Sequence, residues 1–209
     1  MKFRVFVFAV FAATVSGCQY KAEPLPIASY NVYSSYGDKL PGKYLLYVDP
    51  SALSRDIKPS DMNCAAHTFP LDLRSGFKGS VSKTFATLVT ELQLVERPVD
   101  RADLAAQGAK GMIIVKGEEF DGRLRVVPGF WTVGMETEVQ LAASIIVDGP
   151  KGRLLGSTVA GEGNAQGDAG AFCEGGAKAL IDSAEKALKQ TVGRLGEALT
   201  NSERVRKGS

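Results

Sequence analysis

The most reactive side chains in this 209-residue chain are three cysteines and a single histidine. Cys18 stands at the end of an N-terminal stretch that begins with Lys2 and Arg4 and continues through the apolar residues 5–15 to Ser16 and Gly17. A charged start, a short apolar run and small residues describe a secretory signal peptide. The run falls short of the roughly 20 residues that a membrane-spanning helix needs. A thiol placed there is available as a nucleophile for modification.

The residues Val15-Ser16-Gly17-Cys18 resemble the lipobox of bacterial lipoproteins. The resemblance implies that residues 1–17 are a cleaved signal peptide, and that Cys18 carries diacylglycerol on sulfur and an acyl chain such as palmitate on its new amine. Two or three acyl chains anchor a protein stably, whereas one does not. Gln19, which stands where a sorting Asp would stand, implies the periplasmic side of the outer membrane, with the inner membrane and the cell surface as alternatives. The competing interpretation is a signal anchor, or a buried strand, with an incidental cysteine.

With Cys18 assigned to lipid, Cys64 and Cys173 remain and allow one pairing only. Because the periplasm is oxidising, we expect a Cys64–Cys173 disulfide. A catalytic or metal-binding pair is the alternative, but neither a CxxC motif nor a neighbouring histidine supports it. We expect no cofactor and no bound metal.

His67 is the one histidine, and it falls on the apolar face of a predicted strand, which favours a structural role. The alternative is a periplasmic hydrolase that uses His67 with a serine such as Ser82, or a pair of acidic residues. A zinc site would require both Cys64 and Cys173 as ligands. The acidic residues in 117–121 and at Glu136 and Glu138 fit Ca²⁺ or paired carboxylates, but also fit wet strand faces.

The glycine-rich stretch GEGNAQGDAG, residues 161–170, matches neither a dinucleotide fingerprint nor a Walker motif. We interpret it as a loop ending in a helix cap at Asp168.

Charge and length limit the class of protein. The chain holds 25 Lys and Arg against 23 Asp and Glu, and Lys2 and Arg4 leave with the signal peptide, so the remaining chain is balanced. The basic footprint of nucleic-acid binding is therefore absent. We divide the chain into a lipidated cysteine and tether (18–42), one periplasmic domain (43–200) and a basic, disordered tail that is frayed and solvated (201–209).

Hydrophobic periodicity predicts an α+β domain, an antiparallel sheet with two main helices on one face. Val81, Phe85, Leu88, Val89 and Leu92 share one face of a helix for which Ser80 is a plausible cap. A second helix starts near Gly175 with an apolar stripe. The predicted strands are residues 43–49, 64–73, 111–120, 133–147 and 153–161, the last two joined as a hairpin.

Phe130 and Trp131 stand beside a Pro-Gly turn between two predicted strands. They form either buried packing over the sheet or an exposed tip for a partner or the membrane interface.

The lipobox, the tether, the stretch FPLDLRSGFKGSVSKTFATLV and the closing VQLAASIIVDGPKGRLLGSTVAGEG plus helix together resemble the small envelope lipoproteins of the YajG type. The resemblance implies a periplasmic α+β domain with no catalytic residues to carry over. We therefore expect a membrane-anchored, non-enzymatic binding or assembly module, an accessory subunit of an envelope transport or surface-structure machine. Its partner would be another envelope protein, joined through a sheet edge or the aromatic loop.

Overall fold

The computed structural model describes residues 20, 24–60, 64–128, 133–170 and 172–208. Cys18, Phe130 and Trp131 lie outside these described residues. The elements in chain order are β1 (Leu40–Asp49), β2 (Ser54–Ile57), β3 (Phe69–Asp72), α1 (Arg74–Leu88), β4 (Val89–Leu94), α2 (Arg101–Ala106), β5 (Ala109–Pro128), β6 (Val133–Gly149), β7 (Gly152–Asp168), α3 (Gly175–Thr200) and α4 (Glu203–Lys207).

The main sheet has the strand order β4-β1-β5-β6-β7, and β2 and β3 form a separate antiparallel pair. The α+β class is confirmed. Strands β5, β6 and β7 are antiparallel as expected, but β1 pairs in parallel with both β4 and β5, so the sheet is mixed. Parallel pairing requires a crossover, which α1 provides between β1 and β4.

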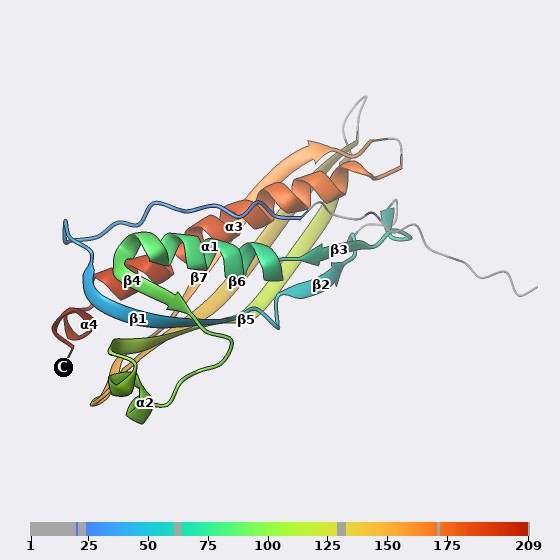
Figure 1. The fold of residues 1–209 in the computed structure, drawn as a ribbon. Coiled ribbons are helices and arrows are strands. Elements are labelled where there is room, and N and C mark those ends of the chain that lie inside the picture. Colours follow the sequence, from blue (N-terminus) through green and yellow to red (C-terminus); the bar gives the residue numbers. More distant parts are fainter. Residues whose placement is uncertain (1–19, 21–23, 61–63, 129–132, 171, 209) are drawn as a thin grey trace, which may run out of the picture.

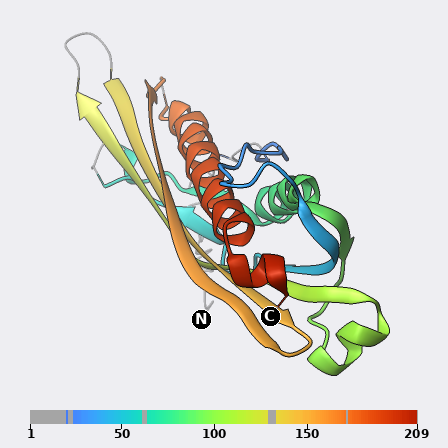
Figure 2. The same ribbon diagram turned by 90° about the vertical axis from the view of Figure 1, so that its left-hand side faces the viewer.

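Helices α1 and α3 lie side by side on one face of the sheet (Figures 1 and 2). The predicted stripe of α3 is confirmed, since Leu180, Ala184, Leu188, Val192 and Leu195 are all fully buried. Helix α1 begins at Arg74, where the Asp72 carboxylate accepts the Arg74 backbone N–H. Ser80 is therefore a buried residue inside this helix and not its cap. No helix in the described part of the chain has both the length and the apolar character to cross a bilayer.

The longest strands extend well beyond the core that α1 and α3 share. Strand β7 includes residues that we predicted to form a loop. Residues 161–168 continue β7 and pair with β6 as far as Gly134↔Asp168. The glycines there have a packing reason. A Cβ on Gly161 would meet the carbonyl oxygen of Ala187 at 2.5 Å, and a Cβ on Gly163 would meet the Ala187 backbone nitrogen at 2.7 Å. Glycine thus allows the α3 backbone to lie directly on the strand.

Buried hydroxyl groups tie α3 to the sheet at the same place. Thr137 on β6 donates to the carbonyl of Ala179 at 2.8 Å, and its hydroxyl lies 2.5 Å from that of Ser183. Further along the helix, Thr191 donates to the carbonyl of Leu141 at 3.1 Å. Because these buried hydroxyls have hydrogen-bond partners, the free-energy cost of removing them from water is offset.

Part of the predicted tether, residues 24–36, packs on the domain instead. We call residues 24–36 the N-terminal segment. Leu25 and Tyr30 are buried, the Ala28 N–H donates to the Ser80 hydroxyl, and the Tyr30 N–H donates to that of Thr84. Figure 1 shows the segment as a blue strand-like stretch running along the helices. Its prolines and tyrosines suggested a tether because the sequence of an extended segment lacks periodicity whether that segment is packed on a domain or free in solvent.

The polar tail also forms a structured end. Residues 203–207 make α4, whose Val205 is fully buried. Ser202 caps this helix by accepting the Val205 N–H, and the Arg206 guanidinium lies 3.8 Å from the ring centre of Tyr36. The expectation of a frayed tail is corrected because one apolar residue and a helix cap suffice to hold it.

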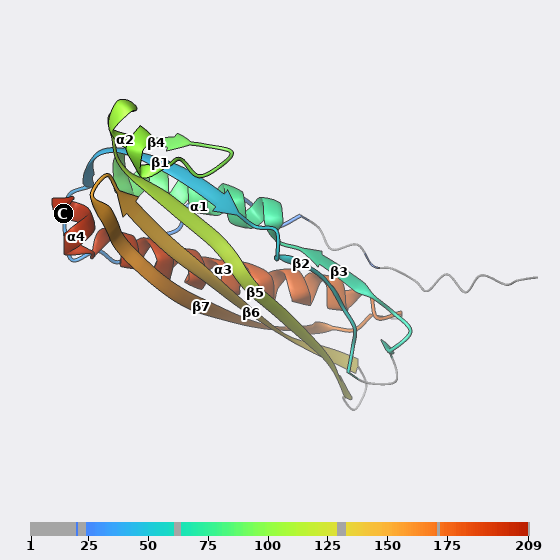
Figure 3. The ribbon, with the colours of Figure 1, turned by 90° about the horizontal axis from the view of Figure 1, so that it is seen from below.

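A second, smaller core lies on the opposite face of the sheet, at the end that carries α2. Leu45, Met112, Leu104 and Ala109 are buried together there. Arg101 of α2 contacts the Asp148 carboxylate at 2.8 Å, which fixes α2 to β6. Over β5, β6 and β7, no helix of the described residues covers the remainder of this outer face (Figure 3).

The glycine contacts predict an asymmetric response to adding a single methyl group along β7. We expect Gly163→Ala to lower the free energy of unfolding by about 1 to 3 kcal/mol, because the methyl group overpacks a backbone contact that cannot yield. The matched control is Gly156→Ala on the same strand, where the nearest atom to an added Cβ is 3.8 Å away. Urea denaturation should show the control unchanged within about 0.5 kcal/mol. Equal losses in the two variants would contradict the packing explanation.

Candidate binding surface

Three rows of polar side chains cross the open outer face of β5, β6 and β7. Strand register places the residues of each row opposite one another. Because side chains alternate between the faces of a strand, every second residue of this ribbon points away from the helices. The rows are Arg125–Glu136–Gln166, Arg123–Glu138–Asn164 and Asp121–Gln140–Glu162.

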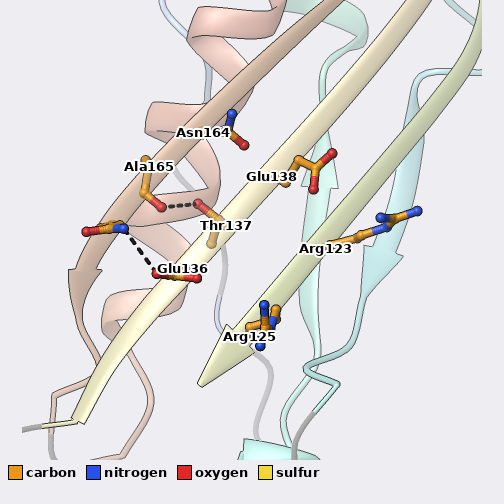
Figure 4. A pocket seen from close by; sticks show the side chains of 8 residues that line it. Arg123, Arg125, Glu136, Thr137, Glu138, Asn164 and Ala165 are labelled. Carbon is orange, nitrogen blue, oxygen red and sulfur yellow. Dashed lines mark hydrogen bonds between the residues drawn. The ribbon is translucent and has the colours of Figure 1, made fainter. Parts of the chain in front are cut away.

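The first two rows line a shallow hollow of about 350 Å³ (Figure 4). The Gln166 amide donates to Glu136 at 3.1 Å, and the Gln140 amide donates to Glu138 at 2.7 Å. Arg123 and Arg125 lie along β5 beside the two glutamates of β6. The hollow therefore presents a pair of cations on β5 beside a pair of anions on β6 and neutral amides on β7, all carried by paired strands.

Asp121 continues this pattern toward the β2–β3 pair. Its carboxylate accepts from Arg55 of β2 at 2.9 Å and lies 3.8 Å from the Arg123 guanidinium. Arg55 also donates to the carbonyl of Phe120. These contacts join β2 to β5 and place the Asp121 carboxylate between Arg55 and Arg123.

Such a surface can bind by charge complementarity. Arginine pairs with carboxylate or phosphate in a bidentate manner, yet each arginine here has a glutamate as its neighbour. An isolated small anion would meet that negative charge, whereas a protein surface can present both signs at the right spacing.

Glu118 extends the polar face at the bulge of β5. The Ser144 hydroxyl donates to one carboxylate oxygen at 2.5 Å, and the Lys116 ammonium contacts the other at 3.1 Å. The hydrogen bond from Ser144, and next that from Lys116, lowers the pKa of the Glu118 carboxyl. The charged form is therefore favoured in the folded protein.

His67 lies apart from this surface. Its ring centre is 5.2 Å from that of Tyr20, and its Nδ1 is buried without a hydrogen-bond partner among the described residues. A catalytic base needs a group on Nδ1 to orient it, as well as a nucleophile. The Ser82 hydroxyl donates to the carbonyl of Lys78 on its own helix. Among the described residues, His67 Nδ1 and the Ser82 hydroxyl therefore do not bond to each other.

The predicted Cys64–Cys173 disulfide is present, with a Cα–Cα distance of 6.1 Å. It joins the segment ahead of β3 to the start of α3 across 109 positions of sequence. Glu136 and Glu138 share a strand face as expected, but no group of three or more His, Cys, Asp or Glu side chains that could hold a metal occurs among the described residues.

Sequence reasoning missed the arginine half of the surface. Arg123 and Arg125 alternate with the buried Leu124 and Val126, which is the signal of a half-buried strand. The predicted strand ended at Phe120, so it did not include this alternation. Asn164 and Gln166 fell in the residues interpreted as a loop.

The Glu118 contacts predict a change in its titration. We expect Ser144→Ala to raise the pKa of Glu118 toward its ordinary value, because the largest stabilising hydrogen bond is lost. A folded-state pKa below the unfolded value favours folding above the unfolded pKa, and this contribution is lost as the pH falls through the folded pKa. Since Glu118 is partly exposed, the effect on stability is small. Carboxyl-carbon NMR titration measures the shift, and Ser82→Ala on α1 serves as the control that leaves Glu118 unchanged.

No family model and no curated protein matches this chain. Among solved structures it is similar to protein XCC0632 from Xanthomonas campestris, of the DUF330 family, with 7% identity over 86% of this chain and 92% of the other and a TM-score of 0.49. It is also similar to the hypothetical protein CT253 from Chlamydia trachomatis, with 11% identity, coverage of 74% and 95%, and a TM-score of 0.38. A neuraminyllactose-binding hemagglutinin homolog from Helicobacter pylori gives 9% identity, coverage of 88% and 97%, and a TM-score of 0.45. At these values none of the three assigns the chain to a family.

Proposed function

We propose that this protein is a lipid-anchored, non-enzymatic binding module of the bacterial cell envelope, on the periplasmic side of the outer membrane. Its partner would be another envelope protein, for which it serves as an accessory subunit of a transport or surface-structure machine. The anchor follows from the lipobox-like Val15-Ser16-Gly17-Cys18, and the resemblance to YajG-type lipoproteins agrees with it. The observation that carries the binding role is the open face of β5, β6 and β7, where a pair of arginines lies beside a pair of glutamates.

The open face suits a protein partner for two physical reasons. Its side chains stand on hydrogen-bonded strands, so little backbone entropy is lost when a partner binds. Its adjacent arginine and glutamate pairs select a partner with the opposite charge pattern and reject one with like charges in register. Neither reason requires a reactive group on the surface.

The sheet edge at β7 suits a partner less well, because α3 occupies it. The Lys186 ammonium donates to the carbonyl of Asn164 at 2.7 Å, and the Gln190 side chain accepts the Glu162 N–H at 3.1 Å. Arg194 donates to the carbonyl of Ala160. Edge groups that would pair with an added strand are thus already bonded, a device that prevents edge-to-edge association. The face of the ribbon is therefore our preferred docking surface.

Charge reversal tests the docking surface. A photo-crosslinking residue at Gln140, in the middle of the face, should give a discrete protein adduct in intact cells. Arg123→Glu combined with Arg125→Glu should abolish that adduct, because two attractive contacts become repulsive. The control is Arg97→Glu combined with Lys151→Glu, which makes the same change in net charge at exposed positions away from the face. An adduct that survives the first pair, or is lost equally in the control, would refute docking at this face.

Substitution of the anchor residue tests the localisation. Cys18→Ser should release the protein from membranes into the soluble periplasmic fraction and block metabolic labelling by a fatty-acid analogue, because the thiol that receives the diacylglycerol is gone. Membrane fractionation and gel fluorescence measure both effects. Labelling that persists in this variant would sink the lipoprotein assignment.

A further inference from the structure

Tyr20 is fixed to the end of the molecule that holds the disulfide. Its backbone N–H donates to the carbonyl of Thr68 at 3.2 Å, and its hydroxyl donates to the carbonyl of Phe172. Its ring stacks on that of Phe69 with ring centres 5.5 Å apart. Tyr20 therefore bridges the two segments that Cys64 and Cys173 join, the one ahead of β3 and the one ahead of α3.

The distance along the chain from Tyr20 to the proposed anchor is very short. Only Gln19 separates Tyr20 from Cys18, and two residues of fully extended chain span at most about 7 Å. An acyl chain on Cys18 would thus enter the bilayer next to the point where Tyr20 is bound. The domain cannot be lifted off the membrane by residues 24–36, because they pack along α1 after this point.

The same end exposes apolar side chains to solvent. Phe172 is 73% exposed, although its backbone N–H is held by the Glu174 carboxylate. Val133 is 41% exposed, and its carbonyl accepts the Ala169 N–H at 2.8 Å, which joins the start of β6 to the turn that leads to Phe172. An exposed aromatic ring on an anchored backbone fits the interface between lipid headgroups and acyl chains.

We propose that the end of the molecule formed by Tyr20, the disulfide and Phe172 rests directly on the lipid bilayer, with the Phe172 side chain in the membrane interface. This inference rests on the lipid anchor at Cys18 stated under the proposed function. The occupant of the exposed apolar surface is the bilayer that holds the anchor, since the chain cannot move away from it. Helix α3 starts at this end and carries the rest of the domain outward.

A matched control position lies at the far end of α3. Tyr33 is 83% exposed, and its carbonyl accepts from Asn201, the residue that follows the helix. A helix of 26 residues is about 39 Å long, so Tyr33 and Phe172 lie at opposite ends of it. Both are exposed aromatic residues, so we expect a Trp at either position to leave the fold unchanged.

The experiment uses the lipidated full chain, purified in detergent and reconstituted into phosphatidylcholine liposomes with brominated acyl chains, which quench nearby Trp fluorescence. Both variants carry Trp131→Phe, so that one Trp reports. Phe172→Trp should lose more than half of its emission relative to unbrominated liposomes, and Tyr33→Trp should lose almost none. Flotation of the same samples on a density gradient confirms that the protein is on the liposomes.

The possible outcomes separate the two proposals. Flotation without quenching at position 172 overturns the orientation and leaves the anchor standing, and would point instead to a protein partner for Phe172. Equal quenching at both positions means that the molecule lies flat, which also overturns the inference. Loss of flotation overturns the anchor, and the inference with it.

A change in the length of the link provides an independent variant. A long Gly-Ser insertion between Gln19 and Tyr20 leaves the domain and the anchor intact but separates them. The emission of Phe172→Trp should recover in this variant while flotation is unchanged. Quenching that stays the same would show that the short link does not set the orientation, and would overturn the proposal.

Discussion

The close approach of α3 to β7 at Gly161 and Gly163 is the constraint on which the rest of the fold depends. Because neither strand residue has a side chain, the helix backbone comes near enough for Ser183 and Thr191 to bond to the sheet. The apolar stripe of α3 then meets the inner face of β6 without a gap. A helix held further out would leave these hydroxyls unpaired and the stripe partly wet, and each loss costs on the order of 1 to 3 kcal/mol.

The position of α3 also decides which surfaces remain for binding. Its long polar side chains bond to the backbone of β7 and so cover that edge of the sheet. The N-terminal segment covers part of α1. What stays open is the outer face of β5, β6 and β7, where Arg123 is exposed and Glu138 is half-buried on paired strands. The same packing that stabilises one side of the ribbon thereby leaves the other side as a flat, charged surface.

Periodic elements could be predicted from the sequence, and contacts between distant segments could not. The α3 stripe and the alternation over 133–147 predicted a helix and a strand that the structure confirms. The glycines in 161–170 indicated a loop because their role, contact with a helix, has no local signature. Parallel pairing of β1 with β4 and β5 was missed for the same reason, since register between strands that do not follow one another is set by the whole fold. Of the charged surface, Glu136, Glu138 and the acidic residues in 117–121 were singled out in advance, whereas Arg123 and Arg125 were not.

The disulfide and Tyr20 make the proposed membrane end depend on the redox state of the compartment. Tyr20 bonds to Thr68 on one side of the Cys64–Cys173 bridge and to Phe172 on the other. The bridge keeps these two segments at the spacing that Tyr20 requires. Structural disulfides persist in oxidising compartments and are rare in the cytosol. The contacts that hold Tyr20 therefore fit a compartment outside the cytosol, where the disulfide that joins their two segments persists.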